Sequence, residues 1–118
     1  MGFDENGICD ACRYNQVKAN SIDWELRESK LIELLDKYRK NNGQYDVVVP
    51  GSGGKDSAFT SHILKYKYGM NPLTVTWAPH LYTDIGWKNF TNWCHIGGHD
   101  NLLFTPNGKL HRHLTRLA

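Results

Sequence analysis

Three short apolar runs along the chain predict β-strands. The segment 45–49 contains three consecutive valines, 73–77 reads Leu-Thr-Val-Thr-Trp, and 101–105 reads Asn-Leu-Leu-Phe-Thr. Short runs rich in β-branched and aromatic residues are typical of strands, and the three consecutive valines predict a strand that is buried. Turn residues follow two of the runs, at Pro79 and at 106–108, and they predict where those strands end.

The segments between these runs have the spacing of helices. Ser21 or Asp23 is suited to cap a helix that ends near 41–43, where Asn-Asn-Gly is a C-cap signal. Further helices are predicted from 57 to about Tyr68, over 84–93, and from Lys109 onward. Strands that alternate with helices in this way predict a parallel sheet with right-handed crossovers.

The predicted fold class is α/β: a partial doubly wound, Rossmann-like parallel sheet with flanking helices, preceded by a short cysteine-pair segment. We expect residues 1–20 to form the cysteine-pair segment, and 21–118 to form the amino-terminal part of a nucleotide-binding domain. A doubly wound sheet usually has about five or six strands, and only three are predicted here. The first strand is then left with a bare side, so we expect self-association through the incomplete sheet or a marginally stable fold.

Composition and charge narrow the classes of function. The chain has 118 residues and a formal net charge of +2, which is too mild for a strongly basic nucleic-acid surface. Crossing a membrane takes a run of about 18 apolar residues, and no run in the chain approaches that length. The first residues are acidic and lack the apolar core of a signal peptide. We therefore expect a cytoplasmic protein with no membrane partner, and a nucleic-acid partner is not favoured.

The segment 51–57, Gly-Ser-Gly-Gly-Lys-Asp-Ser, carries the strongest chemical signal. It joins a predicted strand to a predicted helix. Glycines in such a loop let the backbone approach an anion, and the N–H groups of the first helical turn then face that anion. The arrangement predicts a phosphate-binding loop.

Two common nucleotide motifs do not fit this loop. A Walker A loop needs Ser or Thr after Gly-Lys, where this chain has Asp56, and a dinucleotide fingerprint needs a third glycine at that same position. The run 52–57, Ser-Gly-Gly-Lys-Asp-Ser, instead resembles the S-G-G-x-D-S loop of the PP-loop ATP pyrophosphatase superfamily. Those enzymes cleave ATP between the α and β phosphates and transfer AMP to a carbonyl oxygen.

A closer resemblance extends over nearly the whole chain. The blocks 3–12, 51–57, 73–77 and 82–89 together are similar to the N-acetyl sugar amidotransferase family. Members of that family act in surface polysaccharide and flagellin sugar pathways, where they convert an acetamido group on a nucleotide-linked sugar to an acetamidino group. They also carry another C-x-x-C upstream and continue beyond Ala118, so the resemblance implies part of such a protein.

The resemblance implies an adenine nucleotide alpha hydrolase type of fold, with ATP and Mg²⁺ as cofactors. ATP activates the acetamido carbonyl by adenylation, and ammonia then displaces AMP. Ammonia is expected from a separate glutaminase that works with a cyclase-like subunit. The expected nucleotide-binding residues of the loop are Ser52, Gly53, Gly54, Lys55, Asp56 and Ser57. Of these, Lys55 and Asp56 are the expected catalytic residues. Lys55 is suited to neutralise phosphate charge. Asp56 is suited to lie beside Mg²⁺, or else to accept hydrogen bonds from the loop's own N–H groups.

Three further residues lie at the end of the second strand or beyond it, on the side where open α/β sheets bind ligands. Trp77 is suited to stack on the adenine base, or else to fill the core. Asp84 is suited to contact the sugar substrate or to cap the third helix. Asn89 is the second expected substrate-binding residue.

Cys9 and Cys12 have the spacing of half a structural zinc site. A thioredoxin-like redox pair is the less favoured alternative, because that motif normally follows a strand within a βαβ unit. Zinc is therefore an expected cofactor where two further ligands complete the pair. The third cysteine, Cys94, is expected to be a small buried residue.

Two other functions remain open from the sequence. Some tRNA thiolation enzymes also combine cysteine pairs with a PP-loop, and tRNA binding that falls steeply with salt would favour that class. A non-catalytic nucleotide-binding module is the third possibility. Nucleotide binding without ATP–pyrophosphate exchange would distinguish it from an enzyme.

Overall fold

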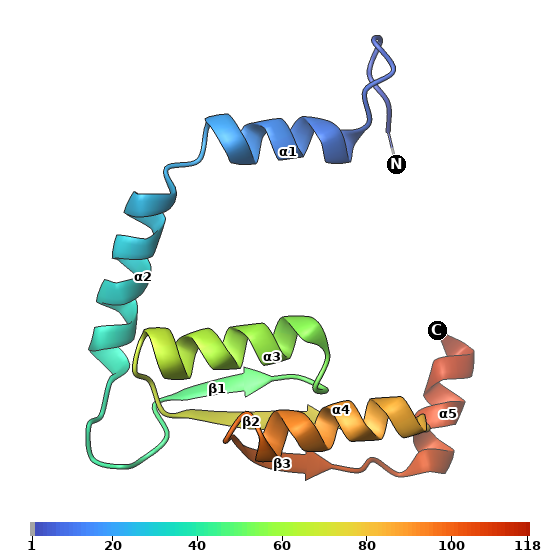
Figure 1. Ribbon diagram of the computed structural model, residues 1–118. Helices are drawn as coiled ribbons and strands as arrows, with labels where there is room; N and C mark the ends of the chain where they lie inside the picture. The colour runs from blue at the N-terminus through green and yellow to red at the C-terminus, as the bar shows by residue number, and fades with distance from the viewer. Residues whose placement is uncertain (1) are drawn as a thin grey trace. The chain divides into compact units, whose positions relative to one another are not determined.

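The computed structural model describes residues 2–118, so Met1 lies outside the described residues. The chain divides into two compact units, Met1–Leu34 and Leu35–Ala118. None of the helices among the described residues is both long and apolar enough to cross a membrane. Figure 1 labels the helices and strands of both units.

The first unit begins with a small hairpin in which Phe3 and Cys9 form an antiparallel bridge. One oxygen of Asp4 accepts hydrogen bonds from the backbone N–H groups of Asn6 and Ile8, at 3.0 and 2.9 Å. Gly7 has a φ of 75°, the left-handed conformation that the predicted Asn-Gly turn requires. The hairpin therefore holds its shape through backbone and carboxylate hydrogen bonds.

Helix α1 follows over Asp10–Asn20, where the sequence predicted only a cysteine-pair segment. None of its residues is buried. Its larger apolar residues, Tyr14 and Val17, are exposed, so the helix has no buried apolar stripe, and its short, mostly polar sequence gave no clear periodic signal. The prediction missed this helix for that reason.

Helix α2 covers Trp24–Tyr38. Asp23 accepts a hydrogen bond from the backbone N–H of Leu26 at 2.8 Å, so it is the capping residue rather than Ser21, which ends α1 instead. The helix ends at Tyr38, a few residues before the predicted stop. Asn41 and Gly43 then adopt left-handed conformations, with φ of 50° and 79°.

The second unit contains the predicted three-stranded parallel sheet. Its strands are β1 Val47–Pro50, β2 Pro72–Trp77 and β3 Asp100–Phe104, in the order β1-β2-β3. Thr74 lies opposite Val49 on one side and opposite Asn101 on the other. The α/β class and the parallel sheet with flanking helices are therefore confirmed.

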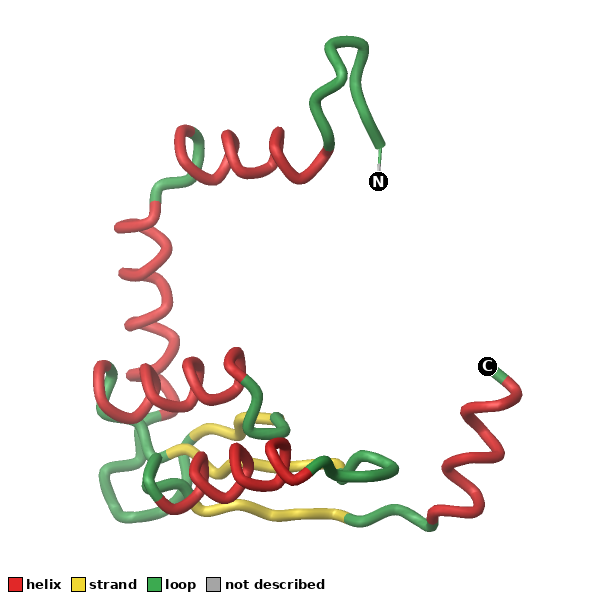
Figure 2. Tube along the Cα trace, turned by 45° about the vertical axis from the view of Figure 1, so that its right-hand side comes forward, coloured by secondary structure: helices red, strands yellow, loops and turns green. Residues whose placement is uncertain are grey.

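Three helices belong to this unit: α3 Lys55–His62, which continues as a π-helical turn over Ile63–Lys67, α4 Asp84–His95, and α5 Gly108–Leu117. Figures 1 and 2 show α3 and α4 running side by side along the strands. The indole N–H of Trp93 on α4 donates to the hydroxyl of Ser61 on α3 at 2.8 Å, and this bond is buried. The two helices therefore cover the same face of the sheet.

The face of the sheet beneath these helices is partly polar. Thr74 and Thr76 are completely buried, and the amide nitrogen of Asn101 donates to both of their hydroxyl oxygens at 2.9 Å. Thr74 in turn donates to the carbonyl of Asp100 at 2.6 Å. Buried hydroxyl groups are tolerated when they are hydrogen-bonded, so this network joins β2 to β3 in addition to the backbone ladder.

The opposite face of the sheet is exposed among the described residues. It presents alternate residues of each strand, including Val48, Trp77, Leu102 and Phe104, which are all more than half exposed. The predicted burial of the first strand holds on one face only, since Val49 is buried and Val48 is 59% exposed. The apolar runs indicate strands that pack against other elements, and among the described residues helices cover only one face of the sheet.

The open edge of β1 is not a free template for pairing. The N–H of Gly51 donates to the carbonyl of Val75 at 2.9 Å, and alternate residues of a parallel strand face the same neighbour. Pro50 therefore directs its nitrogen, which carries no hydrogen, toward the open edge. A proline at this position limits the pairing of another strand.

His99 yields the first prediction, because burial lowers its pKa, with smaller contributions from the charges of Lys65 and His62. Its ring is only 7% exposed. As pH falls below about 6.5, the unfolded chain binds a proton that the folded chain resists, so stability is lost. We expect the native protein to lose more thermal stability between pH 7.5 and 5.5 than His99→Leu does. Equal losses in paired thermal melts would contradict this role of His99.

Candidate phosphate-binding loop

The predicted phosphate loop is a four-residue connection, 51–54, between β1 and α3. Gly54 is the N-cap residue, with φ −72° and ψ 168°, and no side chain of residues 2–118 caps the helix. Ala58 is the first residue to donate within the helix, to the carbonyl of Gly54 at 3.0 Å. The N–H groups of the preceding three residues therefore point out of the helix toward the loop.

The glycines of the loop have different roles. Gly53 has a φ of 80°, and a Cβ there would lie 2.7 Å from the Cα of Phe90 on α4. At Gly51 a Cβ would lie 2.2 Å from the Cβ of Ser57. At Gly54 the nearest atom to a Cβ would be the Ser52 hydroxyl oxygen, at 3.7 Å. Gly51 and Gly53 are thus required by packing, whereas Gly54 faces open space.

The polar side chains of the loop also differ in what they do. Ser57 donates its hydroxyl hydrogen to the carbonyl of Gly54 at 3.0 Å, so it shapes the loop. Ser52, Lys55 and Asp56 are exposed. Asp56 and Ser57 also line a cavity of about 290 Å³ between β1 and α3. Of the six loop residues that the sequence selected, only Asp56 and Ser57 line this cavity.

Trp77 ends β2 at the same end of the sheet. Its side chain is 60% exposed, so the alternative that it fills the core is wrong. Its ring lies 4.9 Å from the ring of Phe104 and 5.8 Å from that of His111, measured between centroids. These residues and others of α5 line an apolar cavity of about 280 Å³. An exposed aromatic face next to a cavity is suited to stack on a planar ligand.

The expected substrate residues lie on α4. The hydroxyl oxygen of Thr83 accepts from the N–H of Gly86 at 3.0 Å, so Thr83 caps the helix and Asp84 does not. Asp84 is exposed in the first turn. Asn89 is next to the loop, because a Cβ at Gly53 would lie 3.3 Å from its carbonyl carbon.

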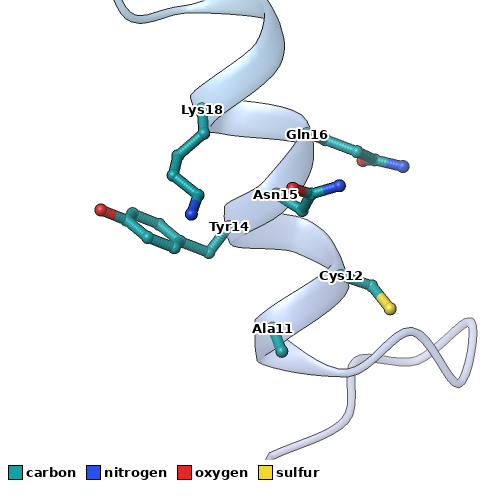
Figure 3. A pocket seen from close by; sticks show the side chains of 6 residues that line it. All are labelled: Ala11, Cys12, Tyr14, Asn15, Gln16 and Lys18. Carbon is teal, nitrogen blue, oxygen red and sulfur yellow. The ribbon is translucent and has the colours of Figure 1, made fainter. Parts of the chain in front are cut away.

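The cysteine pair belongs to the first unit. Cys9 is the half-buried N-cap residue of α1 and Cys12 is exposed in its first turn; both are free thiols. Hydrogen bonds from the backbone N–H and the thiol of Cys12 lower the pKa of Cys9. Figure 3 shows Cys12 on the opposite side of α1 from Tyr14 and Lys18. Within residues 2–118, no group of three or more His, Cys, Asp or Glu side chains is arranged to hold a metal.

Sequence reasoning missed two parts of the site. It did not foresee that α4 would pack against Gly53, because that contact joins residues more than thirty positions apart. It also did not foresee that α5 would line the cavity at Trp77. The capping of α5 by Asn107, which accepts from Lys109 N–H at 3.0 Å, was a readable signal for where α5 begins.

Comparison with known proteins gives limited information. No family model matches the chain. An uncharacterized protein of Methanocaldococcus jannaschii is 36% identical over 53 residues, which are 45% of this chain and 19% of that protein. The chain thus matches about a fifth of the length of this relative. The family resemblance drawn from the motifs stays a prediction.

The two central glycines of the loop provide a matched test of the geometry. Gly53→Ala places a Cβ against the backbone of α4 and forces a left-handed conformation on alanine, so we expect a loss of about 1–3 kcal/mol in the free energy of unfolding. Gly54→Ala, in open space with an ordinary φ, should change it by less than about 0.5 kcal/mol. Urea denaturation of both variants measures the difference. Equal losses would show that the loop does not pack against α4.

Proposed function

We propose that this chain is the ATP-binding part of a PP-loop amidotransferase that acts on a nucleotide-linked N-acetyl sugar. In this proposal the sheet is the first part of an adenine nucleotide alpha hydrolase type of domain. The observation that carries the proposal is the loop at 51–54, in which a strand leads through packed glycines into an uncapped helix N-terminus. The Ser-Gly-Gly-Lys-Asp-Ser motif supplies the class of chemistry, and we place it in the cytoplasm.

The phosphate chain of ATP is proposed to lie over Gly54. This is the position at which the loop leaves room, and the N–H groups of the first turn of α3 point toward it. Those groups and the positive end of the helix dipole stabilise the charge of the departing pyrophosphate. Lys55 is exposed at the first position of the helix and is proposed to add a mobile positive charge. Ser52 is proposed to donate its hydroxyl hydrogen to a phosphate oxygen.

Asp56 fits a role beside Mg²⁺. Its carboxylate is exposed, lies one position into the helix, and lines the cavity beside β1. Carboxylate oxygen is the donor that Mg²⁺ takes from proteins when it also binds phosphate. Mg²⁺, when bound, neutralises phosphate charge. A carboxylate alone would repel the phosphate chain, so Asp56 is proposed to act together with the metal. Ser57 is proposed only to shape the loop, through its hydrogen bond to the carbonyl of Gly54.

The adenine base is proposed to stack on Trp77. Pro50 is paired with Val75, so Trp77 lies two residues, or about 7 Å, farther along the neighbouring strand. The phosphate loop begins at Gly51, directly after Pro50, and therefore at the same end of the sheet as Trp77. A nucleotide is long enough to reach from the loop to this aromatic face.

The sugar substrate is proposed to contact α4 through Asp84 and Asn89. Asn89 is next to the loop, so the acetamido oxygen of a substrate held there would be close to the phosphates. An amide carbon resists ammonia until its oxygen becomes a good leaving group, and adenylation provides that group. Holding the two reactants in line is then the main contribution of the protein. Ammonia is proposed to come from separate glutaminase and cyclase-like subunits.

The cysteine pair is proposed to be a structural zinc half-site. The donor set fits, because thiolate sulfur is the ligand of structural zinc, and Cys9, the N-cap residue of α1, and Cys12 stand three positions apart at the start of that helix. Zinc would hold the hairpin to the start of α1. No step of the proposed reaction involves this metal.

Gly54→Val tests the nucleotide site. The branched side chain occupies the space over the loop, so we expect calorimetric affinity for Mg²⁺-ATP to fall at least tenfold while the melting temperature changes little. Phe59→Ala, at an exposed position on the same helix, is the matched control and should bind ATP normally. Unchanged ATP affinity in the Gly54 variant would refute the loop assignment.

The class of reaction needs a second measurement. An amidotransferase of this type should exchange pyrophosphate into ATP when a nucleotide-linked N-acetyl sugar is present. ATP binding without any exchange would favour a non-catalytic nucleotide-binding module. Binding of tRNA that falls steeply with salt would favour thiolation.

A further inference from the structure

A cavity of about 670 Å³ lies between α4 and the edge strand β3, which are neighbours in Figure 1. Ligand pockets usually measure about 300–1,000 Å³, so its size suits a small molecule. The residues that line it include Trp87, Phe90 and Cys94 on α4 and His99, Asn101 and Leu103 in β3 or just before it. None of the described residues that line it belongs to the phosphate loop or to the cavity at Trp77. It is therefore a separate candidate site.

Two residues that line this cavity carry buried polar atoms without a hydrogen-bond partner. They are Nδ1 of His99 and Oδ1 of Asn101, and His99 is only 7% exposed. The amide nitrogen of Asn101 already donates to Thr74 and Thr76, so only its oxygen is unused. Buried polar atoms are rarely left unpaired, because the loss of their bonds to water is then not compensated. Each of the two atoms therefore calls for a partner.

One ligand group can satisfy both atoms. His99 and Asn101 stand on either side of Asp100 at the start of β3, so their Cα atoms are at most about 7 Å apart. Burial lowers the pKa of His99, so its ring is uncharged at neutral pH, and one ring nitrogen carries a hydrogen. With that hydrogen on Nδ1, His99 donates while the oxygen of Asn101 accepts. The matching group is an N–H donor with a hydrogen-bond acceptor beside it.

The walls of the cavity favour a flat ligand without charge. The rings of Trp87 and Phe90 lie 5.5 Å apart between centroids and form an aromatic wall. The described residues that line the cavity include no lysine or arginine and one carboxylate, that of Asp100, which accepts from the hydroxyl of Tyr45 at 2.6 Å. No free charge is therefore available to pair with an ion, whereas an aromatic ring is well placed to stack.

We propose that this cavity binds a nucleobase, which stacks on the aromatic wall and hydrogen-bonds to Asn101 and His99. The inference rests on the proposed function in one respect: the base is that of the sugar nucleotide. Phe90 lines the cavity and also adjoins Gly53 of the loop. Asn89, the proposed sugar contact, is five residues before Cys94, or about 7–8 Å along α4. One substrate is therefore long enough to reach from the loop into the cavity.

The test is a titration of the full chain with uridine, cytidine and adenosine, which carry a base and no phosphate. We expect one of them to bind at one per chain by calorimetry and to shift the NMR signals of Cys94, His99 and Asn101. The same nucleoside with its donor nitrogen fully methylated, such as N3-methyluridine, should bind about tenfold more weakly, because the oxygen of Asn101 then has no donor.

Variants make the outcome specific to the cavity. His99→Phe keeps a ring but removes both nitrogens, so nucleoside affinity should fall about tenfold. Thr91→Phe adds a ring inside the cavity and should abolish binding without touching the two unpaired atoms. Asn92→Phe adds the same ring at an exposed position on α4 outside the cavity and should bind normally. Thermal melts of the three variants show that each is folded.

Several results would overturn the proposal. If none of the three nucleosides binds, the unpaired atoms hold only water. Binding that survives Thr91→Phe would place the ligand elsewhere, and binding that is lost in Trp77→Ala but kept in His99→Phe would place the base at Trp77. Gly54→Val should leave nucleoside affinity unchanged while it weakens ATP binding. Failure of the base site and failure of the phosphate loop are therefore distinguishable.

Discussion

The close approach of Gly53 to the backbone of α4 is the constraint on which the second unit depends. A Cβ at Gly53 would lie 2.7 Å from the Cα of Phe90, so only glycine lets the loop and the helix meet. This contact fixes the turn between β1 and α3, and therefore where the N–H groups of α3 point. It also brings Asn89 to the loop. The same contact thus stabilises the fold and assembles the candidate site.

The sheet beneath these helices combines packing with hydrogen bonds. Trp93 fills the space between α3 and α4 and donates to Ser61, while Asn101 satisfies the buried hydroxyls of Thr74 and Thr76. Each of these polar groups is in an apolar setting, so leaving one unpaired is unfavourable by about 1–3 kcal/mol. The network therefore favours one alignment of β2 with β3 and one position of α4. The opposite face of the sheet carries exposed apolar residues, and no such hydrogen-bond network is found there among the described residues.

The two units differ in what maintains them. The second unit has a small core that includes Val49, Phe90 and Trp93. The first has a hairpin held by Asp4, Asp10 and Arg13 around two cysteines, with no buried residue in α1.

The sequence by itself determined the strands, most helices and the loop, because these depend on neighbouring residues. The valine run and the glycine loop that leads into a helix are local signals, and the structure agrees with both. For the cap of α2 the sequence left Ser21 and Asp23 open, and the structure selects Asp23. Helix α1 was missed because it is short, mostly polar and buries no apolar face.

Only the tertiary structure decided which glycine packs and which leaves room for a ligand, because that depends on where α4 lies relative to the loop. It also decided that Trp77 is exposed beside α5 rather than buried. A residue's pattern along the chain tells which side of a strand it occupies. Whether another element covers that side depends on contacts between distant segments, which no local pattern contains.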